Sequence, residues 1–340
     1  MSVVPVCPVY QQCGGCQYQH VTYTQELATK THQLKEILKP LSLDEALFAP
    51  ILASPLEYHY RNRLDLKLQR MKGGEVLIGF SPLGKKGIIQ IGHCPIARDD
   101  INGFLPTVKA QAIAKLTPKY KQASLVVRSG DGQNPAWGGI GPKSLQMDHA
   151  NYFWTDIAGK RIFYSLETFF QANLSILPKA IELMRALPIW SKDAIFFDLY
   201  GGVGLFGLCF EGLVSRVLLI EENTASVKIA RYNADHNKLV TFDVYAGGVE
   251  EVLPKLLPVY EDRPKIMMVD PPRAGLSKAS VQCLNDLKNV KHMLYLSCHP
   301  ESLCDNLRDM SGYWKVQKVM PLDFFPKTRH LETLVLLEKS

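Results

Sequence analysis

The chain has 340 residues, of which 46% are hydrophobic and 21% charged, and its formal net charge is +6. This composition is ordinary for a globular protein, and it excludes the low-complexity and collagen-like classes. The length allows two packed domains. The N-terminal stretch lacks the pattern of a signal peptide, and no apolar run approaches the ~18 residues of a membrane span, so we expect a cytoplasmic protein without a membrane partner.

The first half of the chain predicts one helix followed by a β-rich region. Residues 25–41 carry apolar side chains at helical spacing. Residues 50–165 show short alternating segments separated by glycine-rich turns, with a small helical insert.

The second half predicts an α/β fold built on a doubly wound parallel sheet. Five apolar segments alternate with helix-compatible stretches, at residues 194–200, 216–221, 240–247, 265–270 and 291–298. Two further segments, 314–323 and 331–339, are joined by a connection that is too short for a helical crossover. We therefore expect them to form an antiparallel pair that closes the sheet.

Acidic residues and a glycine-rich loop follow the predicted strands. The loop DLYGGVGLFG starts at Asp198, and Glu221 ends the next strand, where a carboxylate can accept hydrogen bonds from ribose hydroxyls. For Asp198, ligand contact and bracing of the loop are equally compatible with the pattern. Asp270 and Cys298 end two further strands, and parallel strands place their carboxyl ends at one edge of the sheet. The sequence therefore predicts a ligand site at this edge.

Cys298 stands before a helix expected to start near Pro300, and a helix N-terminus can lower the pKa of a thiol from its ordinary ~8.5. A thiolate can add to carbon 6 of uracil, which makes carbon 5 nucleophilic enough to accept a methyl group. Glu332 begins the antiparallel strand at the same edge, where it can remove the proton on carbon 5. The alternatives are core packing for Cys298 and an ion pair with Arg329 or His330 for Glu332.

Four cysteines in the first 100 residues predict a metal or cluster site. Cys7, Cys13 and Cys16 have the spacing C-x5-C-x2-C, and Cys94 is distant. Four thiolates suit a structural zinc or an iron–sulfur cluster, and three grouped cysteines with one distant cysteine favour a 4Fe-4S cluster. The remaining three cysteines outside the site, Cys209, Cys283 and Cys304, are expected to be packing residues.

Several motifs together resemble the RNA uracil-5 methyltransferase family, specifically its iron–sulfur branch that acts on bacterial 23S ribosomal RNA. They are CGGCQYQH (13–20), YRNR (60–63), FFQAN (169–173), DLYGGVG, DPPRAGL, LSCHP and HLETLVLL. The resemblance covers nearly the whole chain and matches the shorter type of enzyme, which has no N-terminal TRAM barrel. Family members often have a cysteine where Gly201 stands and an asparagine where Leu205 and Gly248 stand, so cofactor contacts there differ.

The resemblance implies a class I (Rossmann-like) methyltransferase domain that binds S-adenosylmethionine. It further implies specific residue roles, namely a 4Fe-4S cluster on Cys7, Cys13, Cys16 and Cys94, cofactor contacts from Gln171, Tyr200, Glu221 and Asp270, nucleophile Cys298 and base Glu332. The catalytic domain would comprise residues 18–47 and 166–340. Residues 1–17 and 48–165 would form a β-rich RNA-binding domain that carries the cluster.

The expected partner is a uridine in a loop or junction of 23S ribosomal RNA, flipped out of its stack and bound by a monomeric enzyme. Five basic residues of the β-rich region could contact phosphates, namely Arg61, Arg63, Lys67, Lys85 and Lys86. Three other functions are compatible with parts of the pattern: a transfer-RNA uracil-5 methyltransferase, an amino-nitrogen methyltransferase and a non-catalytic RNA-binding relative. Arg273 follows the DPP motif where amino-nitrogen enzymes usually have an aromatic residue, which argues against the second.

Overall fold

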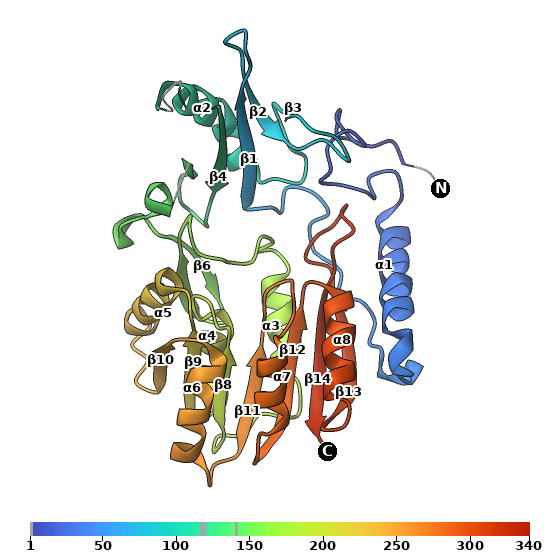
Figure 1. Ribbon diagram of the computed structural model, residues 1–340, viewed down its shortest axis with the longest axis vertical. Coiled ribbons are helices and arrows are strands. Elements are labelled where there is room, and N and C mark those ends of the chain that lie inside the picture. The colour runs from blue at the N-terminus through green and yellow to red at the C-terminus, as the bar shows by residue number, and fades with distance from the viewer. Residues whose placement is uncertain (1–2, 116–118, 120, 140–141) are drawn as a thin grey trace.

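A seven-stranded sheet forms the lower half of the computed structural model, which describes residues 3–115, 119, 121–139 and 142–340 (Figure 1). The strand order is β10-β9-β8-β11-β12-β14-β13. The strands are β8 (Ile195–Leu199), β9 (Arg216–Glu221), β10 (Phe242–Ala246), β11 (Lys265–Val269), β12 (Val290–Ser297), β13 (Trp314–Leu322) and β14 (Glu332–Lys339). The first five strands in sheet order are parallel, and β14 runs antiparallel to both of its neighbours. The predicted α/β fold and its antiparallel closing pair are confirmed.

Helices cover both faces of this sheet because alternate strand residues point to opposite sides. In β8, Phe196 packs with α3 (Leu177–Arg185), α4 (Leu205–Phe210) and α5 (Thr224–His236). Its neighbours Ile195 and Phe197 pack on the other side, where the helices are α6 (Val249–Leu256), α7 (Lys278–Asn285) and α8 (Pro300–Met310). The sheet is therefore buried on both faces, which explains why the sequences of its strands are continuous apolar runs.

The β-rich region forms a separate five-stranded antiparallel sheet in the order β3-β2-β1-β4-β5. Its strands are β1 (Arg63–Arg70), β2 (Val76–Phe80), β3 (Ile89–Gln90), β4 (Gln122–Arg128) and β5 (Ala136–Gly139). A helix α2 (Asp99–Lys115) covers one face and packs Ile101, Leu105 and Val108 against the strands. The helix is longer than the small insert expected, because packing outweighs the unfavourable helix propensities of Gly103 and Pro106.

A hairpin lies between the two sheets. Its strands β6 (Phe153–Ile157) and β7 (Lys160–Tyr164) are joined by Ala158 and Gly159, both with positive φ, as in a type I′ turn. The buried side chain of Asn233 in α5 bonds the backbone N–H and C=O of Phe163, at 2.8 and 3.0 Å, and fixes the hairpin on the helix. Short 3-10 helices complete the structure at Lys39–Leu41, Glu45–Leu47, Pro142–Leu145, His149–Asn151, Glu211–Leu213 and Leu257–Tyr260.

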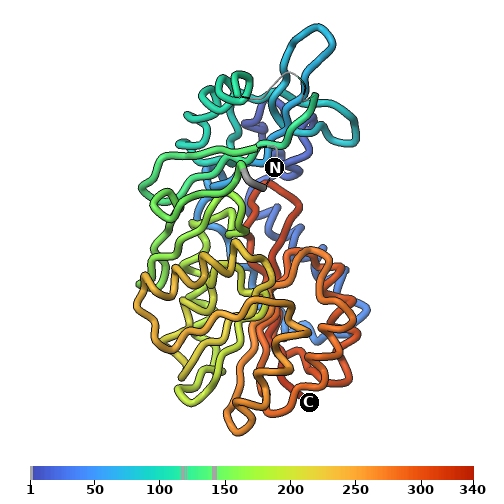
Figure 2. Tube along the Cα trace, turned by 60° about the vertical axis from the view of Figure 1, so that its left-hand side comes forward, coloured from blue at the N-terminus to red at the C-terminus, as the bar shows by residue number. Residues whose placement is uncertain are grey.

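The first helix, α1 (Tyr23–Leu38), lies beside α8 and β13, at the opposite end of the chain (Figures 1 and 2). Its apolar face packs Leu34 and Leu38 against Cys304, Val319 and Leu331. The prediction of a helix over residues 25–41 is confirmed, and the helix starts slightly earlier because Thr22 and Gln25 form a capping box. No helix among the described residues is long and apolar enough to cross a membrane.

A buried cluster of charges joins α1 to the loop before β14. Lys30 Nζ lies 2.8 Å from Glu26 and 2.7 Å from Asp323, and all three side chains are almost fully buried. Tyr23 donates a hydrogen bond of 2.8 Å to the same Asp323 carboxylate. Asp323 thus depends on Lys30 for a neutralising charge, and Glu26 shares Lys30 with Lys327, which lies 3.5 Å away.

We expect Lys30→Met to lower the free energy of unfolding by about 3–5 kcal/mol, because it leaves the buried carboxylate of Asp323 uncompensated. Lys35→Met is the matched control, since Lys35 lies on the same helix as Lys30 and pairs with the exposed carboxylate of Glu45 outside that helix. That control should cost less than about 1 kcal/mol. Urea unfolding followed by circular dichroism measures both, and equal losses for the two variants would contradict the assignment.

Candidate functional site

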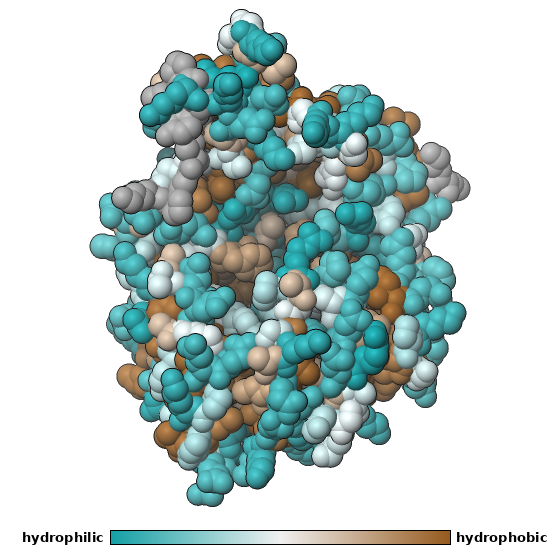
Figure 3. Space-filling view, viewed as in Figure 1, coloured by the Kyte–Doolittle hydropathy of each residue, from teal (hydrophilic) through white to brown (hydrophobic). Residues whose placement is uncertain are grey.

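A cavity of about 590 Å³ lies at the carboxyl edge of the parallel strands. Figure 3 shows the molecular surface hollowed on this face, between the five-stranded sheet above and the seven-stranded sheet below. The six residues for which the sequence predicted cofactor or catalytic roles all line this cavity, namely Gln171, Tyr200, Glu221, Asp270, Cys298 and Glu332. They come from six different strands or loops, and the strand order brings them together.

Cys298 and Glu332 face one another across an antiparallel strand pair. The register of β12 and β14 ends at Ser297 with Thr333, and Cys298 and Glu332 are the residues that follow and precede this last pair. The Glu332 carboxylate is close enough to raise the pKa of the Cys298 thiol. Residues directly opposite in such a pair have Cβ atoms about 4.5–5.5 Å apart, and their side chains are on the same face. A thiol and a carboxylate thus lie side by side in the wall of the cavity.

Burial changes the protonation of both groups. It raises the pKa of Glu332 to about 8, with a further contribution from Asp270. Burial raises the pKa of Asp270 itself to about 7. For Cys298, burial and the carboxylates of Glu332 and Asp270 raise the pKa to about 12. The expectation of a lowered thiol pKa is therefore wrong for the free protein, because burial and two acids outweigh the N-terminus of α8.

The glycine-rich loop after β8 shapes another wall of the cavity. The carboxylate of Glu221 accepts hydrogen bonds from the backbone N–H groups of Gly202 and Asn223, at 2.9 and 2.7 Å. Tyr200 has a positive φ of 58°, and its hydroxyl is 2.8 Å from Ser280 Oγ. A side chain at position 201 has no room, since a Cβ on Gly201 would lie 2.6 Å from Leu219 Cγ. This contact explains why the chain has glycine rather than cysteine there.

Asp198 braces this loop. Its side chain is fully buried and does not line the cavity, and Oδ2 accepts a 2.8 Å hydrogen bond from the backbone N–H of Gly207. Burial raises its pKa to about 8. Of the two interpretations open from the sequence, the geometry favours loop bracing over ligand contact.

A buried arginine that the motifs did not indicate holds the segment that carries Gln171. Arg128 at the end of β4 donates hydrogen bonds to the carbonyl oxygens of Ser165, Thr168 and Phe170, at 2.6, 2.7 and 3.0 Å. Gln171 is 3% exposed, and its Oε1 has no hydrogen-bond partner among the described residues. An unpaired buried acceptor in a cavity wall is available for a ligand donor.

Phe169 is a second residue of the cavity wall that sequence reasoning missed. It is 67% exposed although it is a large apolar side chain, and the cavity lies beside it. The only signal was its place in the FFQAN motif.

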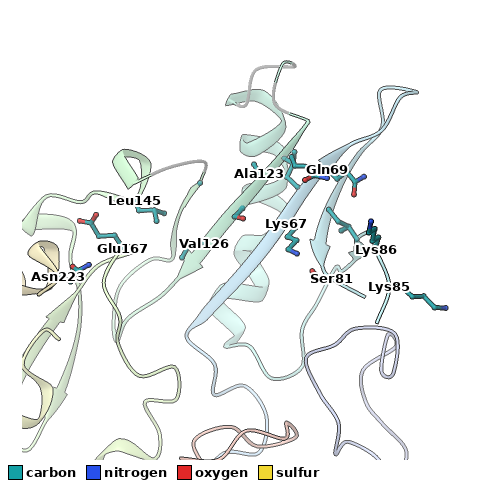
Figure 4. Close-up of a pocket in the computed structure, with 16 residues that line it drawn as sticks. Lys67, Gln69, Ser81, Lys85, Lys86, Ala123, Val126, Leu145, Glu167 and Asn223 are labelled. Carbon is teal, nitrogen blue, oxygen red and sulfur yellow. The ribbon is translucent and has the colours of Figure 1, made fainter. Parts of the chain in front are cut away.

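A wide groove of about 1140 Å³ adjoins the cavity on the side of the five-stranded sheet. Figure 4 shows Lys67, Lys85 and Lys86 on one side of this groove, and Glu167 and Asn223 on the other. Glu167 and Asn223 also line the cavity, so the two spaces adjoin at these residues.

The other two basic residues considered for phosphate contact lie elsewhere. Arg63 pairs with Asp65 at 2.8 Å and bonds the backbone of Leu166, and Arg61 lines a different cavity.

That different cavity has a volume of about 390 Å³, and all four N-terminal cysteines line it. The amide group of Asn102 holds Cys94 in place through both backbone atoms, at 2.8 and 3.1 Å. Burial raises the pKa of Cys13 and Cys94, and it raises the pKa of Cys16 to about 12. Burial thus favours the neutral thiol at Cys13, Cys16 and Cys94, and a cation bound among them would favour the thiolates.

Four thiols around one cavity are the donor type of both structural zinc and iron–sulfur sites. Within the described residues, no three His, Cys, Asp or Glu side chains lie close enough to hold a single metal. A tetrahedral zinc would hold its sulfur ligands about 3.8 Å apart, from Zn–S bonds of ~2.3 Å. The buried side chain of Gln19 lies beside the cysteines: its Oε1 accepts a 3.0 Å hydrogen bond from the backbone N–H of Cys7, and its amide group lies against Cys16.

Comparisons with known proteins agree with this architecture. An uncharacterized RNA methyltransferase of Thermosynechococcus vestitus is 29% identical over 99% of this chain and 85% of its own length. The tRNA (uracil(54)-C(5))-methyltransferase of Schizosaccharomyces pombe is 26% identical over 98% of this chain and 65% of its own length.

Among solved structures, the Pyrococcus abyssi tRNA (uracil-54, C5)-methyltransferase in complex with S-adenosyl-L-homocysteine has a similar fold. The TM-score is 0.71 at 22% identity, over 95% of this chain and 85% of that one. The family model described as tRNA (Uracil-5-)-methyltransferase matches residues 144–340. Because this match spans more than half of the chain, the protein belongs to the tRNA (uracil-5-)-methyltransferase family of S-adenosylmethionine-dependent RNA methyltransferases.

Proposed function

We propose that this enzyme transfers a methyl group from S-adenosylmethionine to carbon 5 of one uridine in 23S ribosomal RNA, through a covalent bond between Cys298 and uracil. The observation that carries the proposal is the proximity of Cys298 to Glu332 in the wall of one cavity. A thiol and a buried carboxylate at this spacing supply the nucleophile and the base that the reaction needs.

Cys298 makes carbon 5 reactive. Its thiolate would add to carbon 6 of the uracil ring, and the resulting enolate would take the methyl group through carbon 5, with S-adenosylhomocysteine as the leaving group. S-Adenosylmethionine supplies the methyl group and a positive charge on its sulfonium. A positive charge near Cys298 favours the thiolate and so opposes the effect of burial and of the neighbouring carboxylates on the thiol pKa.

Glu332 completes the reaction. After methyl transfer, carbon 5 carries both the methyl group and its original proton, and the carboxylate takes that proton. The electron pair re-forms the double bond between carbons 5 and 6, and the bond from carbon 6 to Cys298 breaks. Its pKa of about 8 makes Glu332 a stronger base than an exposed glutamate, which suits this step.

The remaining residues of the cavity are proposed to bind the cofactor. Glu221 is held by two backbone N–H groups and retains acceptor capacity on both oxygens for ribose hydroxyls. Gln171 offers its unpaired Oε1 to a donor of the cofactor. Tyr200 follows β8 and Asp270 follows β11, and both would contact the same ligand.

We also propose that Cys7, Cys13, Cys16 and Cys94 hold a 4Fe-4S cluster, supported by the size of their common cavity. In this proposal residues 1–17 and 48–165 form the RNA-binding domain, and residues 18–47 and 166–340 form the catalytic domain of a monomer. The wide groove with its three lysines supports RNA binding, because lysines contact phosphates without regard to sequence.

The target uridine must leave its stack, because a stacked base leaves neither face of carbon 6 open to the Cys298 thiolate. A loop or junction in 23S ribosomal RNA lowers the cost of unstacking. Two relatives named for uridine 54 of transfer RNA favour transfer RNA as a second candidate substrate.

Deleting the gene should remove 5-methyluridine from 23S ribosomal RNA and leave it in transfer RNA. Mass spectrometry of nucleosides from the two separated RNA pools measures this change. A plasmid with the wild-type gene should restore the modification, and a Cys298→Ala plasmid should not. Loss of 5-methyluridine from transfer RNA alone would establish the second candidate instead.

The two catalytic residues should differ in covalent trapping. Glu332→Gln keeps the nucleophile and lacks the base, so an adduct between protein and RNA should accumulate and survive denaturing electrophoresis. Cys298→Ala cannot form the bond to carbon 6 and should give no adduct. Cys304→Ala is the matched thiol control, since Cys304 is buried against α1. An adduct with Cys298→Ala would show that another residue is the nucleophile.

Protein purified without oxygen should be brown and contain about four irons per chain. Replacing Cys94 with serine removes one ligand and should reduce the iron content and the visible absorption. Cys283→Ser, outside the cluster cavity, should leave both unchanged. A colourless protein with one stoichiometric zinc would contradict the cluster.

A further inference from the structure

Cys298 lines two separate spaces. One is the cavity proposed for the cofactor, and the other is a groove of about 670 Å³ between α1, the start of α8 and residues 329–331. We call this second space the α1–α8 groove. Arg273 also lines both spaces, so the groove opens directly beside the thiol. If a uracil ring lies at Cys298, the sugar and phosphates of its strand can extend into the α1–α8 groove, which the cofactor does not occupy.

The groove carries unpaired positive charge. Arg273 and Arg329 are exposed, and neither side chain forms an ion pair or hydrogen bond with another described residue. Burial lowers the pKa of His330 to about 4, and Arg273, Arg329, Arg61 and Lys30 contribute to the shift. The imidazole stays neutral partly because cations surround it.

The remaining charges of the groove are largely compensated. Lys30 is bound by Glu26 and Asp323. Glu36 lies 3.5 Å from Lys39, whereas Glu301 lies 3.6 Å from His299, which offsets its charge only when the imidazole is protonated. Even with Glu301 counted as uncompensated, two guanidinium groups outweigh one carboxylate. The two free guanidinium groups therefore set the sign of the potential at the mouth of the groove.

We propose that the α1–α8 groove binds the RNA backbone beside the target uridine, with Arg329 contacting a phosphate. The inference rests on the proposed function, since it assumes that the uracil ring lies against Cys298. Guanidinium groups match phosphates through paired hydrogen bonds, and an exposed unpaired arginine loses no internal contact when it binds one.

The position of the groove gives the RNA a continuous path. The wide groove of Figure 4 adjoins the cofactor cavity at Glu167 and Asn223, and the α1–α8 groove adjoins it at Arg273 and Cys298. The strand would run from the lysines of the five-stranded sheet, across the mouth of the cavity, to α1. The target base would turn inward midway.

The test uses the full-length holoenzyme and a labelled 12-residue oligouridylate, whose phosphate contacts do not depend on which RNA is the natural substrate. Each contact with a single strand contributes about −0.7 to the slope of log K against log salt. Arg329→Gln should therefore reduce the magnitude of the slope by about 0.7 and weaken binding about fivefold at 0.1 M salt. S-Adenosylmethionine affinity should not change.

Lys315→Gln is the matched control. It removes the same charge from an exposed residue of β13 that pairs with Glu338, at the opposite end of the sheet from Cys298. This variant should keep the wild-type slope and affinity. Equal slopes for Arg329→Gln and the wild type, or equal losses for both variants, would overturn the inference. Failure of the proposed function would be seen in a different measurement, because the wild type would then not methylate uridine.

Discussion

The buried guanidinium of Arg128 connects the five-stranded sheet to the cavity of the catalytic half. It is fully buried without a carboxylate partner, and burial lowers its pKa to about 9. Three carbonyl oxygens and the face of the Tyr164 ring compensate the charge. A buried charge is tolerated only where such partners are fixed, so the segment from Ser165 to Phe170 must adopt this one shape. The position of Gln171, the next residue, follows from that constraint.

Much of the fold could be predicted because the parallel strands are buried on both faces. The predicted segment 265–270 coincides almost entirely with β11. A short apolar run that is followed by prolines is too short for a buried helix and therefore indicates a buried strand. The length of α2 could not be predicted, because Gly103 and Pro106 are unfavourable in helices. Its stability comes from contacts of Leu105 and Val108 with strands distant in sequence. Such tertiary packing leaves no local pattern.

In the site, too, the features that follow from strand direction could be predicted, and those that depend on tertiary contacts could not. The proximity of Cys298 and Glu332 could be expected from the opposite directions of their strands, and the two residues flank the last pair of the β12–β14 register. The thiol pKa could not be predicted, because it depends on burial and on Asp270 from a third strand. Arg128 was also inaccessible to sequence reasoning, since an arginine at the end of an apolar strand resembles an ordinary solvent-exposed terminus.

The docking of α1 against the last strands has a consequence for how the chain is made. Lys30 and Asp323 are 293 residues apart in sequence, and Leu34 packs near Leu331. At about 5–20 residues per second, a ribosome needs roughly 15–60 s to cover that interval. For that interval Lys30 and the leucines of α1 have no partners to pack against. The buried cluster that holds α1 can therefore form only after residues 323–331 have been synthesised, at the end of translation.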